Sequence, residues 1–389
     1  MRIQAILILA FSMVAAMPLT SQTARAQLTE STPAESIPLD NRLARVDRMV
    51  AAQMGEQNIP GYSLIVMKDG RIVFKKSYGF ADLESRRPAT SDTIFGLASL
   101  TKTFTALTLL TLVDRGLIDL DSPVGKYIDG LSPPYRALTI RQLASMTGGV
   151  PRRLAREVPW KRQLPILDST PLVSQPGSQF LYSNYSYRLL GTVIANVTGR
   201  PYLETVREIV LGPLGMQSTA TTVLLQETGR VAQGYGDNMG RGPLRAIEYK
   251  NPAVSFSAGM LASTTDDLSR YVEGLLSRKM LSEKGYQTLW YQRPPLSTGA
   301  PSAWAFGWHA GTNEKMGGRY VVAMNGGTQG VASTIIILPE SNSAVIALCN
   351  LRKPPVYAIA RNVAHIVFGS GEPPESSEEL ENLGSTGAD

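Results

Sequence analysis

Strand-like segments lie at the two ends of this chain, and a long helix-rich segment separates them. Residues 61–67 and 71–78 are apolar segments joined by a turn at 68–70, which is the pattern of a β-hairpin. Four more strand-like segments occur near the end, at 304–309, 319–323, 331–338 and 344–349. We therefore predict one antiparallel sheet built from both ends of the chain and flanked by helices, with a mostly helical insertion at about 99–300.

Helical periodicity marks the segments that would cover this sheet. Apolar residues recur at three- and four-residue spacing over 43–54, from about 99 to Gly116, and over 139–146, 187–198, 202–210, 265–276 and 356–368. The predicted class is α+β. The boundary between the sheet and the helical insertion is the natural place for a cleft.

The first 26 residues have the pattern of a secretory signal. Arg2 precedes an apolar run over 6–19, and small residues surround the expected cleavage point after Ala26. We predict a signal peptide over 1–26, one folded domain over 27–370 and an acidic, disordered tail over 371–389. No later segment is apolar enough to cross a bilayer, so we expect a periplasmic or secreted protein without a transmembrane segment after cleavage.

Histidine and cysteine are scarce, and their scarcity limits the possible chemistry. The chain contains two histidines and one cysteine. A Ser-His-Asp triad is disfavoured because G-x-S-x-G is absent, although a Ser-His pair that uses His309 remains an alternative. No zinc-binding or phosphate-binding motif occurs, so we expect no metal and no cofactor. Cys349 ends an apolar run and is expected to be a buried apolar side chain.

The segment Ser99-Leu100-Thr101-Lys102 begins a predicted helix and is the only S-x-x-K in the chain. Spacing i, i+3 places the hydroxyl and the amine on one helix face. The positive end of the helix dipole disfavours protonation of Lys102 and favours negative charge near Ser99. A neutral amine beside a hydroxyl activates it as a nucleophile, whereas the alternative is a capped helix with a surface lysine.

A second candidate element, Tyr182-Ser183-Asn184, follows a Pro-Gly turn and precedes a predicted helix. A phenol near Lys102 can transfer protons between a nucleophile and a leaving group. Asn184 can bind a substrate amide or orient Lys102. The segment Tyr249-Lys250-Asn251 has the same spacing without the Pro-Gly turn, and a buried tyrosine with a satisfied hydroxyl is the alternative for both.

A third element, residues 324–330, has the sequence MNGGTQG and lies between two predicted strands. Gly326 and Gly327 would let the backbone approach a substrate closely and direct an N–H group at an oxyanion. A glycine-rich hairpin turn explains the same spacing.

Together and in this order, the three elements resemble the motifs of the penicillin-recognising serine hydrolases. The most similar branch contains class C β-lactamases, D-alanyl-D-alanine carboxypeptidases, and related esterases and D-aminopeptidases. The resemblance extends from about residue 46 to 368 and includes the stretches at 93–99, 139–143, 258–260 and 306–308. It implies a β-lactamase/transpeptidase-like fold over the folded domain.

The resemblance also implies a role for each motif residue. Ser99 would attack a carbonyl and form an acyl-enzyme, while Lys102 and Tyr182 move the protons. The backbone N–H groups of Ser99 and Gly327 would form the oxyanion hole. Tyr182 is preferred over Tyr249 because the second motif of the family follows such a Pro-Gly stretch. The implied substrate-binding residues are Asn184, Met324, Asn325, Gly326 and Gly327.

The third element departs from the family pattern at its first position. The motif usually begins with Lys or His, then Thr or Ser, then Gly, whereas this chain has Met324, Asn325 and Gly326. Met324 can neither attract a substrate carboxylate nor assist protonation of Tyr182. The substrate is therefore left open among β-lactams, D-amino-acid peptides and esters. The alternative function is a catalytically weak or inactive penicillin-binding-like protein of the cell envelope.

The net charge is +6, and basic residues concentrate in one segment, at Arg152, Arg153, Arg156, Lys161 and Arg162. A solvated surface is one interpretation, and attraction to an acidic polymer, a membrane surface or an anionic substrate is another. If the segment replaces the charge missing at Met324, changing Arg152 and Arg153 to Ala raises KM for an anionic substrate. No nucleic-acid motif occurs. The expected partners are small molecules or short peptides, including cell-wall peptide.

Overall fold

The computed structural model describes residues 38–154, 158–236, 242–249, 251–302, 304–352 and 354–369. The predicted signal peptide and acidic tail lie outside these ranges. None of the helices within them has the length and apolarity needed to span a membrane.

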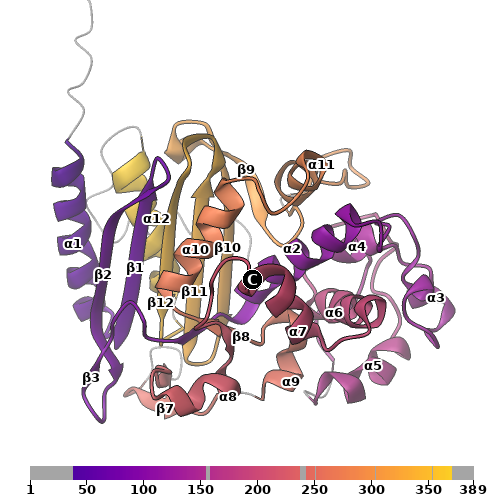
Figure 1. Cartoon of the computed structure of the whole chain (residues 1–389), viewed down its shortest axis with the longest axis horizontal. Helices are drawn as coiled ribbons and strands as arrows, with labels where there is room; N and C mark the ends of the chain where they lie inside the picture. The colour runs from indigo at the N-terminus through magenta and orange to yellow at the C-terminus, as the bar shows by residue number, and fades with distance from the viewer. Residues whose placement is uncertain are drawn as a thin grey trace, which may run out of the picture. The chain divides into compact units, whose positions relative to one another are not determined.

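A seven-stranded antiparallel sheet joins the two ends of the chain, as predicted (Figure 1). The central contact pairs β1 with β12, and Ile65 lies opposite Ile346. The strand order is β3-β2-β1-β12-β11-β10-β9. The strands are β1 (Gly61–Lys68), β2 (Arg71–Asp82), β3 (Arg87–Pro88), β9 (His309–Asn313), β10 (Arg319–Thr328), β11 (Val331–Leu338) and β12 (Ser343–Cys349).

Both faces of the sheet are buried, which explains the nearly continuous apolar sequence of its central strands. On β1, Tyr62 and Leu64 belong to the core shared with α1 (Leu39–Glu56) and α12 (Pro354–Phe368). Ile65 on the same strand belongs to the other core, on the opposite face. Helix α10 (Thr265–Leu276) packs across that face (Figure 1).

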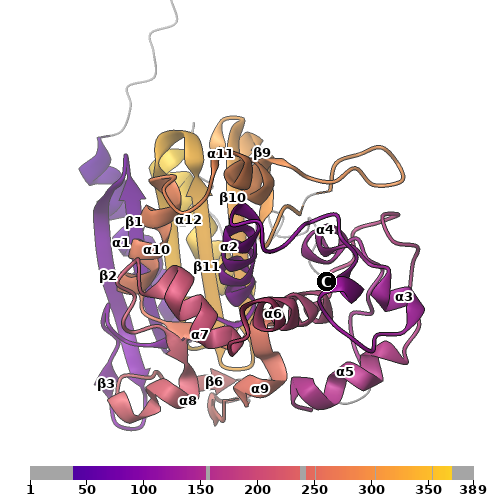
Figure 2. The ribbon, with the colours of Figure 1, turned by 45° about the vertical axis from the view of Figure 1, so that its right-hand side comes forward.

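The helix that begins near Ser99 lies in the middle of the molecule. It starts with a 3₁₀ turn, η1 (Ala98–Leu100), continues as α2 (Thr101–Asp114), and ends just before Gly116, as predicted. Almost every side chain of α2 is buried, because the sheet lies on one side and α6 (Asn184–Thr198) on the other (Figure 2). A lysine in its first turn is therefore removed from water.

The remaining helices occupy the inserted region and one end of the sheet. Helix α7 is shorter than predicted because its last turns widen into a π-helix at Arg207–Leu211. The other helices are α3 (Pro133–Arg136), α4 (Ile140–Ala144), α5 (Trp160–Asp168), α7 (Tyr202–Val206), α8 (Thr222–Leu225), α9 (Pro252–Ser255) and α11 (Glu283–Tyr286).

Two small sheets, formed by the insertion and by the segment just before it, were not predicted. Strands β4 (Phe95–Gly96), β8 (Leu261–Ser263) and β5 (Ala220–Thr221) form one, and β6 (Gly234–Gly236) with β7 (Arg245–Ile247) forms the other. Strands of two or three residues are too short to show an alternating pattern, so only helices and loops were expected there. Strand β4 leads directly into the turn that carries Ser99.

The predicted strand at 304–309 is wrong. Trp304 and His309 form only an isolated bridge, and the Ala305 N–H donates to the Trp308 carbonyl at 2.8 Å. Gly307 has φ of +83°, which turns the chain back on itself, and β9 begins only at His309. Trp304, Phe306 and Trp308 are buried and occupy every second position, which is the sequence pattern of a β-strand.

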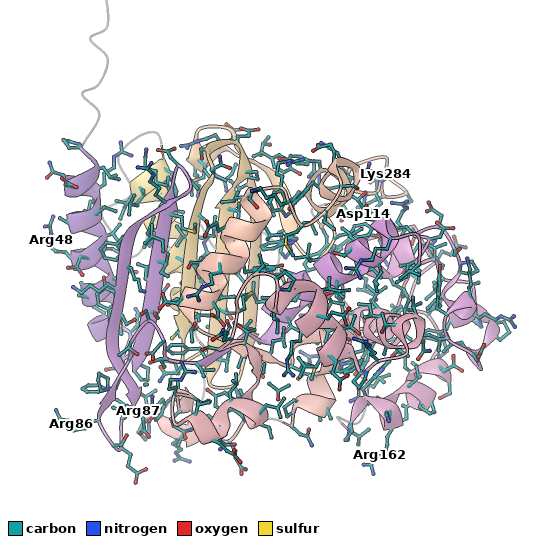
Figure 3. The ribbon with its side chains drawn as sticks, viewed as in Figure 1. Arg48, Arg86, Arg87, Asp114, Arg162 and Lys284 are labelled. Atoms are coloured by element: carbon teal, nitrogen blue, oxygen red, sulfur yellow. The ribbon has the colours of Figure 1, made fainter. Side chains whose placement is uncertain are left out.

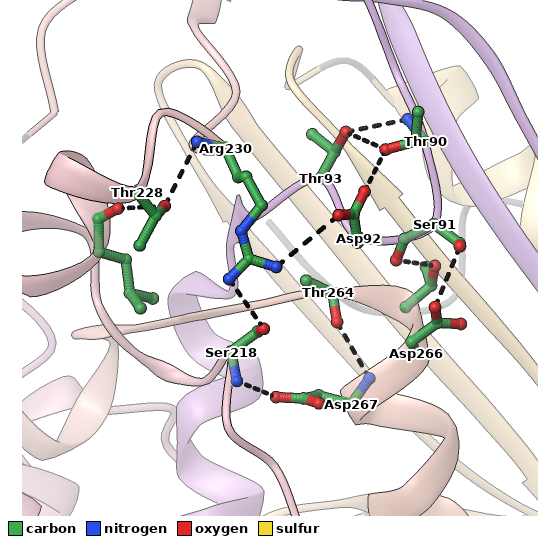
Figure 4. A network of polar contacts seen from close by, with 12 residues as sticks. Thr90, Ser91, Asp92, Thr93, Ser218, Thr228, Arg230, Thr264, Asp266 and Asp267 are labelled. Carbon is green, nitrogen blue, oxygen red and sulfur yellow. Dashed lines mark hydrogen bonds and ion pairs between the residues drawn. The ribbon is translucent and has the colours of Figure 1, made fainter.

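Polar contacts anchor the segment that precedes β4 (Figure 4). The Arg230 guanidinium lies 3.8 Å from Asp92 and donates to Ser218 Oγ at 3.1 Å. Ser91 Oγ donates to Asp266 at 3.0 Å, at the start of α10. These contacts join the segment that leads to β4 and Ser99 to Arg230 and to the start of α10.

Candidate active site

Ser99 lies in a strained turn between β4 and α2. Its predecessor, Ala98, has φ of +46°, a left-handed conformation that is uncommon for residues with a side chain. Such conformations cost about 1–3 kcal/mol and gather at functional sites. Ser99 is half-buried, whereas Ala98 and Leu100 on either side of it are buried.

Three oxygen atoms surround the Lys102 amine, whose side chain is fully buried. Its Nζ lies 3.0 Å from Ser99 Oγ, 2.7 Å from Asn184 Oδ1 and 2.9 Å from the Ala258 carbonyl oxygen. Burial, with the positive charge of Arg188 as a smaller cause, holds the pKa of Lys102 well below its usual value.

The neutral form of Lys102 fits this set of partners. A neutral amine has two N–H donors and one lone pair. The oxygens of Asn184 and Ala258 can only accept hydrogen bonds, so they take both N–H groups. The lone pair is then left to accept the hydroxyl proton of Ser99.

Tyr182 contacts Ser99 from the other side. Its hydroxyl donates to Ser99 Oγ at 2.7 Å, and its ring meets Trp304 edge-on with 5.7 Å between centroids. Burial raises the pKa of Tyr182 to about 12, against the smaller opposing effects of the Ser99 hydrogen bond and the Arg152 charge. The phenol therefore keeps its proton at neutral pH and can donate it.

Ser183 caps helix α6, and its extended backbone makes the side chains of Tyr182 and Asn184 on either side of it point in different directions. Ser183 has an extended backbone, accepts the Tyr185 N–H at 3.2 Å and donates to the Pro151 carbonyl at 2.7 Å. Tyr182 then lies outside the helix and reaches Ser99, whereas Asn184 is the first helical residue and reaches Lys102.

The rival segment at 249–251 makes other contacts: the Tyr249 ring lies near Gly96, but its hydroxyl group is not directed at Ser99. The Tyr249 hydroxyl donates to the Ala232 carbonyl at 2.6 Å. Asn251 caps α9 by accepting the Ala253 N–H at 2.9 Å, and Lys250 is outside the described residues. The structure thus brings Tyr182, and not Tyr249, to Ser99.

Strand β10 packs directly against the turn that carries Ser99. A Cβ atom added to Gly326 would lie 2.0 Å from the Leu97 carbonyl oxygen and 2.9 Å from the Leu100 nitrogen. Ser333, opposite Gly326 on β11, donates to the same Leu97 carbonyl at 2.7 Å. Only glycine allows this approach, which keeps the third element beside Ser99.

Met324 and Asn325 face opposite sides of β10, because side chains alternate along a strand. Met324 is 2% exposed and belongs to the core on the side of α2. Asn325 is exposed. Met324 therefore packs in the apolar core, at the position where the motif of the family usually has a lysine or a histidine.

His309 does not contact Ser99. Its ring packs edge-on against Trp304 with 4.8 Å between centroids, and burial lowers its pKa. Among the described residues, the atoms that hydrogen-bond Ser99 Oγ are Lys102 Nζ and the Tyr182 hydroxyl. The Ser-His alternative thus lacks geometric support. Cys349 is buried as predicted, and burial raises its pKa to about 12.

The basic segment is divided between a loop and α5. Arg152 and Arg153 are exposed on the loop, while Lys161 and Arg162 are exposed on α5, where Arg162 extends outward in Figure 3. Arg156 is outside the described residues. Arg152 is near enough to Tyr182 for its charge to affect the tyrosine pKa.

Sequence reasoning missed two contributors to this site, the Ala258 carbonyl and Arg188. Arg188 lies one turn after Asn184 on α6, is 6% exposed, and donates to Gln163 Oε1. The stretch at 258–260 is part of the family resemblance, but the resemblance implies no role for it. The i, i+4 spacing from Asn184 was the only available signal for Arg188.

Comparisons with known proteins identify the family. Residues 46–368 match the family described as Beta-lactamase. Protein flp of Staphylococcus aureus (strain N315) is 28% identical over 324 residues, which cover 79% of this chain and only 63% of that protein. Penicillin-binding protein 4* of Bacillus subtilis (strain 168) is 24% identical over 339 residues, 81% of this chain and 74% of that protein.

Solved structures show the same fold. An octameric penicillin-binding protein homologue from Pyrococcus abyssi superposes with a TM-score of 0.73 at 25% identity, covering 82% of this chain and 75% of that one. FmtA from Staphylococcus aureus gives a TM-score of 0.72 at 19% identity, covering 87% and 93%. With the family match spanning most of its length and this fold around Ser99, the chain belongs to the β-lactamase family.

Proposed function

We propose that this protein is an exported serine hydrolase that cleaves an amide or ester through an acyl-enzyme on Ser99. One observation carries the proposal. Ser99 Oγ lies between a buried amine at 3.0 Å and a protonated phenol at 2.7 Å. Lys102 is placed to accept a proton from Ser99, and Tyr182 is placed to donate one.

The chemistry follows from these placements. Ser99 Oγ bonds to the substrate carbonyl carbon while its proton moves to Lys102 Nζ. The N–H groups of Ser99 and Gly327 bind the oxyanion. The leaving group takes the Tyr182 proton as its bond to carbon breaks, and the Lys102 ammonium then restores the phenol. Water hydrolyses the ester on Ser99 by the reverse sequence.

The substrate class is an acyl compound of β-lactam, D-amino-acid peptide or simple ester type, including short cell-wall peptides. Two relatives are named penicillin-binding proteins or their homologues, which supports this range. The sequence of residues 1–26 supports export to the periplasm or medium. Asn184, Asn325 and Gly327 would contact the substrate, whereas Met324, which the sequence also suggested, is buried and would support them by packing alone.

A binding protein without turnover is the second candidate, and the uncharged Met324 favours it. Against it, Ser99, Lys102 and Tyr182 make the mutual hydrogen bonds that catalysis needs and that ligand binding alone does not.

Covalent labelling separates the two candidates. We expect a fluorescent fluorophosphonate to label the wild type and Ser85→Ala equally, because Ser85 lies on an exposed turn. Ser99→Ala should not be labelled, since the nucleophile is missing. Labelling is read as in-gel fluorescence, and a fluorescent penicillin tests the β-lactam class in parallel. A wild type that neither reagent labels, although folded by circular dichroism, would leave the binding protein as the better description.

A further inference from the structure

Arg188 places a positive charge in the interior of the protein, on the helix that contacts the amine of Lys102. Its side chain is 6% exposed, and it lies one helical turn after Asn184 on α6. Spacing i, i+4 puts the two side chains on the same face of that helix. Asn184 Oδ1 accepts from Lys102 Nζ at 2.7 Å, so this face of α6 is the one that lies toward Lys102.

Two further contacts tie Arg188 to the surroundings of Lys102. Its Nε donates at 3.4 Å to the carbonyl of Ser255, three residues before Ala258, whose own carbonyl accepts from Lys102 at 2.9 Å. Its guanidinium group also donates to Gln163 Oε1 on α5, and the Gln163 side chain is fully buried. Guanidinium groups do not lose their proton in proteins, so Arg188 is positive at every accessible pH.

The other titratable groups that face the Lys102 amine are neutral. Ser99 Oγ lies 3.0 Å from Nζ, and the ring centroids of Tyr182 and Tyr187 lie 4.9 Å and 5.9 Å from it. Burial raises the pKa of both phenols, so both keep their protons. Among the described residues, Arg188 is the charged group that affects the pKa of Lys102. The charged residues of α7, its π-helical turn and α11, which also pack against α2, are exposed to solvent, and they are Glu204, Arg207, Glu208, Glu283 and Lys284.

We propose that Arg188 is a positioning residue of the active site, whose fixed positive charge keeps the Lys102 amine in the unprotonated form that can accept the Ser99 proton. This inference rests on the proposed hydrolase function. Like charges repel each other more strongly in the protein interior than in water. Protonation of Lys102 therefore costs more free energy while Arg188 is present, and the neutral amine is available at lower pH.

Charge and packing at this place can be changed separately. Arg188→Met removes the cation at a similar side-chain length, and Gln163→Glu leaves Arg188 in place but adds a negative charge beside it. Gln163→Met removes the same hydrogen-bond acceptor without adding a charge, so it is the packing control. Arg48→Met is the matched surface control, because Arg48 is exposed on α1 (Figure 3). Circular dichroism checks that each variant is folded.

The measurement is the rate of inactivation by diisopropyl fluorophosphate as a function of pH. This reagent is uncharged and releases fluoride, which needs no proton from Tyr182, so the rate follows the protonation state of Lys102. We expect the wild-type rate to rise with pH and then level off. In Arg188→Met and Gln163→Glu the midpoint of the rise should move up by about one pH unit, which makes both variants about tenfold slower below the wild-type midpoint. Gln163→Met and Arg48→Met should keep the wild-type midpoint.

The contrary results are distinguishable. If the midpoint of Arg188→Met or of Gln163→Glu stays at the wild-type pH, or if Gln163→Met moves it as far as Gln163→Glu does, the role of the Arg188 charge is overturned while the hydrolase stands. If Arg188→Met does not fold, the two Gln163 variants decide the question. If the wild type does not react with diisopropyl fluorophosphate and hydrolyses no ester, the hydrolase and this role of Arg188 are overturned together.

Discussion

Replacing Lys102 with Met should lower kcat/KM for ester hydrolysis by at least about 10³-fold, because the change removes the one amine that, among the described residues, is placed to take the Ser99 proton. Met has a similar length and suits a fully buried position, so the fold should remain. The measurement is steady-state hydrolysis of phenyl acetate, with circular dichroism to confirm folding. Activity within tenfold of wild type would exclude Lys102 as the base.

The rate of acylation should also depend on pH, in the direction set by the protonation state of Lys102. The neutral amine is the active form, so acylation should rise with pH through the pKa of Lys102 and then level off. Because burial and the charge of Arg188 lower this pKa well below its usual value, the rise should end far below pH 10.5. Lys102→Arg keeps the positive charge at every accessible pH and should be as inactive as Lys102→Met.

Gly326→Ala is expected to lower kcat by at least about 10²-fold, comparable with the loss of an oxyanion-hole donor. A methyl group cannot stand 2.0 Å from the Leu97 carbonyl oxygen, so β10 and the turn with Ser99 must separate. The Gly327 N–H would then lie too far from a carbonyl bonded to Ser99. We also expect a loss of about 1–3 kcal/mol in the free energy of unfolding, typical of overpacking.

Gly55→Ala is the matched control for that variant. Gly55 lies in α1, and apart from its chain neighbours and the backbone of its own helix no atom lies within 4 Å of a Cβ atom placed there. It should leave activity unchanged and slightly raise stability, since Ala favours the helix over Gly. The measurements are single-turnover acylation and urea unfolding. If Gly326→Ala acylates at the wild-type rate, close contact between β10 and the Ser99 turn has no catalytic role.

Much of this architecture could be predicted because the decisive patterns are local. The hairpin at 61–78 can be predicted from apolar segments and a turn alone. The proximity of Ser99 and Lys102 can be predicted from helical spacing alone. The sheet followed from counting strand segments at both ends. The helix from Thr101 was expected to be amphipathic, but tertiary packing covers almost all of it. That difference decides the state of Lys102, because a lysine at the surface would be protonated.

The rest of the site depends on contacts that no spacing reveals. The Ala258 carbonyl reaches Lys102 from 156 residues away, and any residue type provides a carbonyl. Tyr357 and Arg352 meet Gly327 only because the last strand and last helix fold back on β10. The sequence predicts that Gly327 lies against a substrate, whereas Tyr357 and Arg352 fill the space into which a side chain at position 327 would extend.

The pairing of β1 with β12 has a consequence for when the protein becomes active. Ser99 and its helix are made before most of the sheet, because β10, which contains Gly326, and the strands β11 and β12 all come later in the chain. Contacts between residues this far apart in sequence form late and slowly. If Ser99 is the nucleophile that we propose, a chain made only as far as α11 contains it without β10 beside it, so hydrolysis would begin only after β10 has been made and has packed against the Ser99 turn.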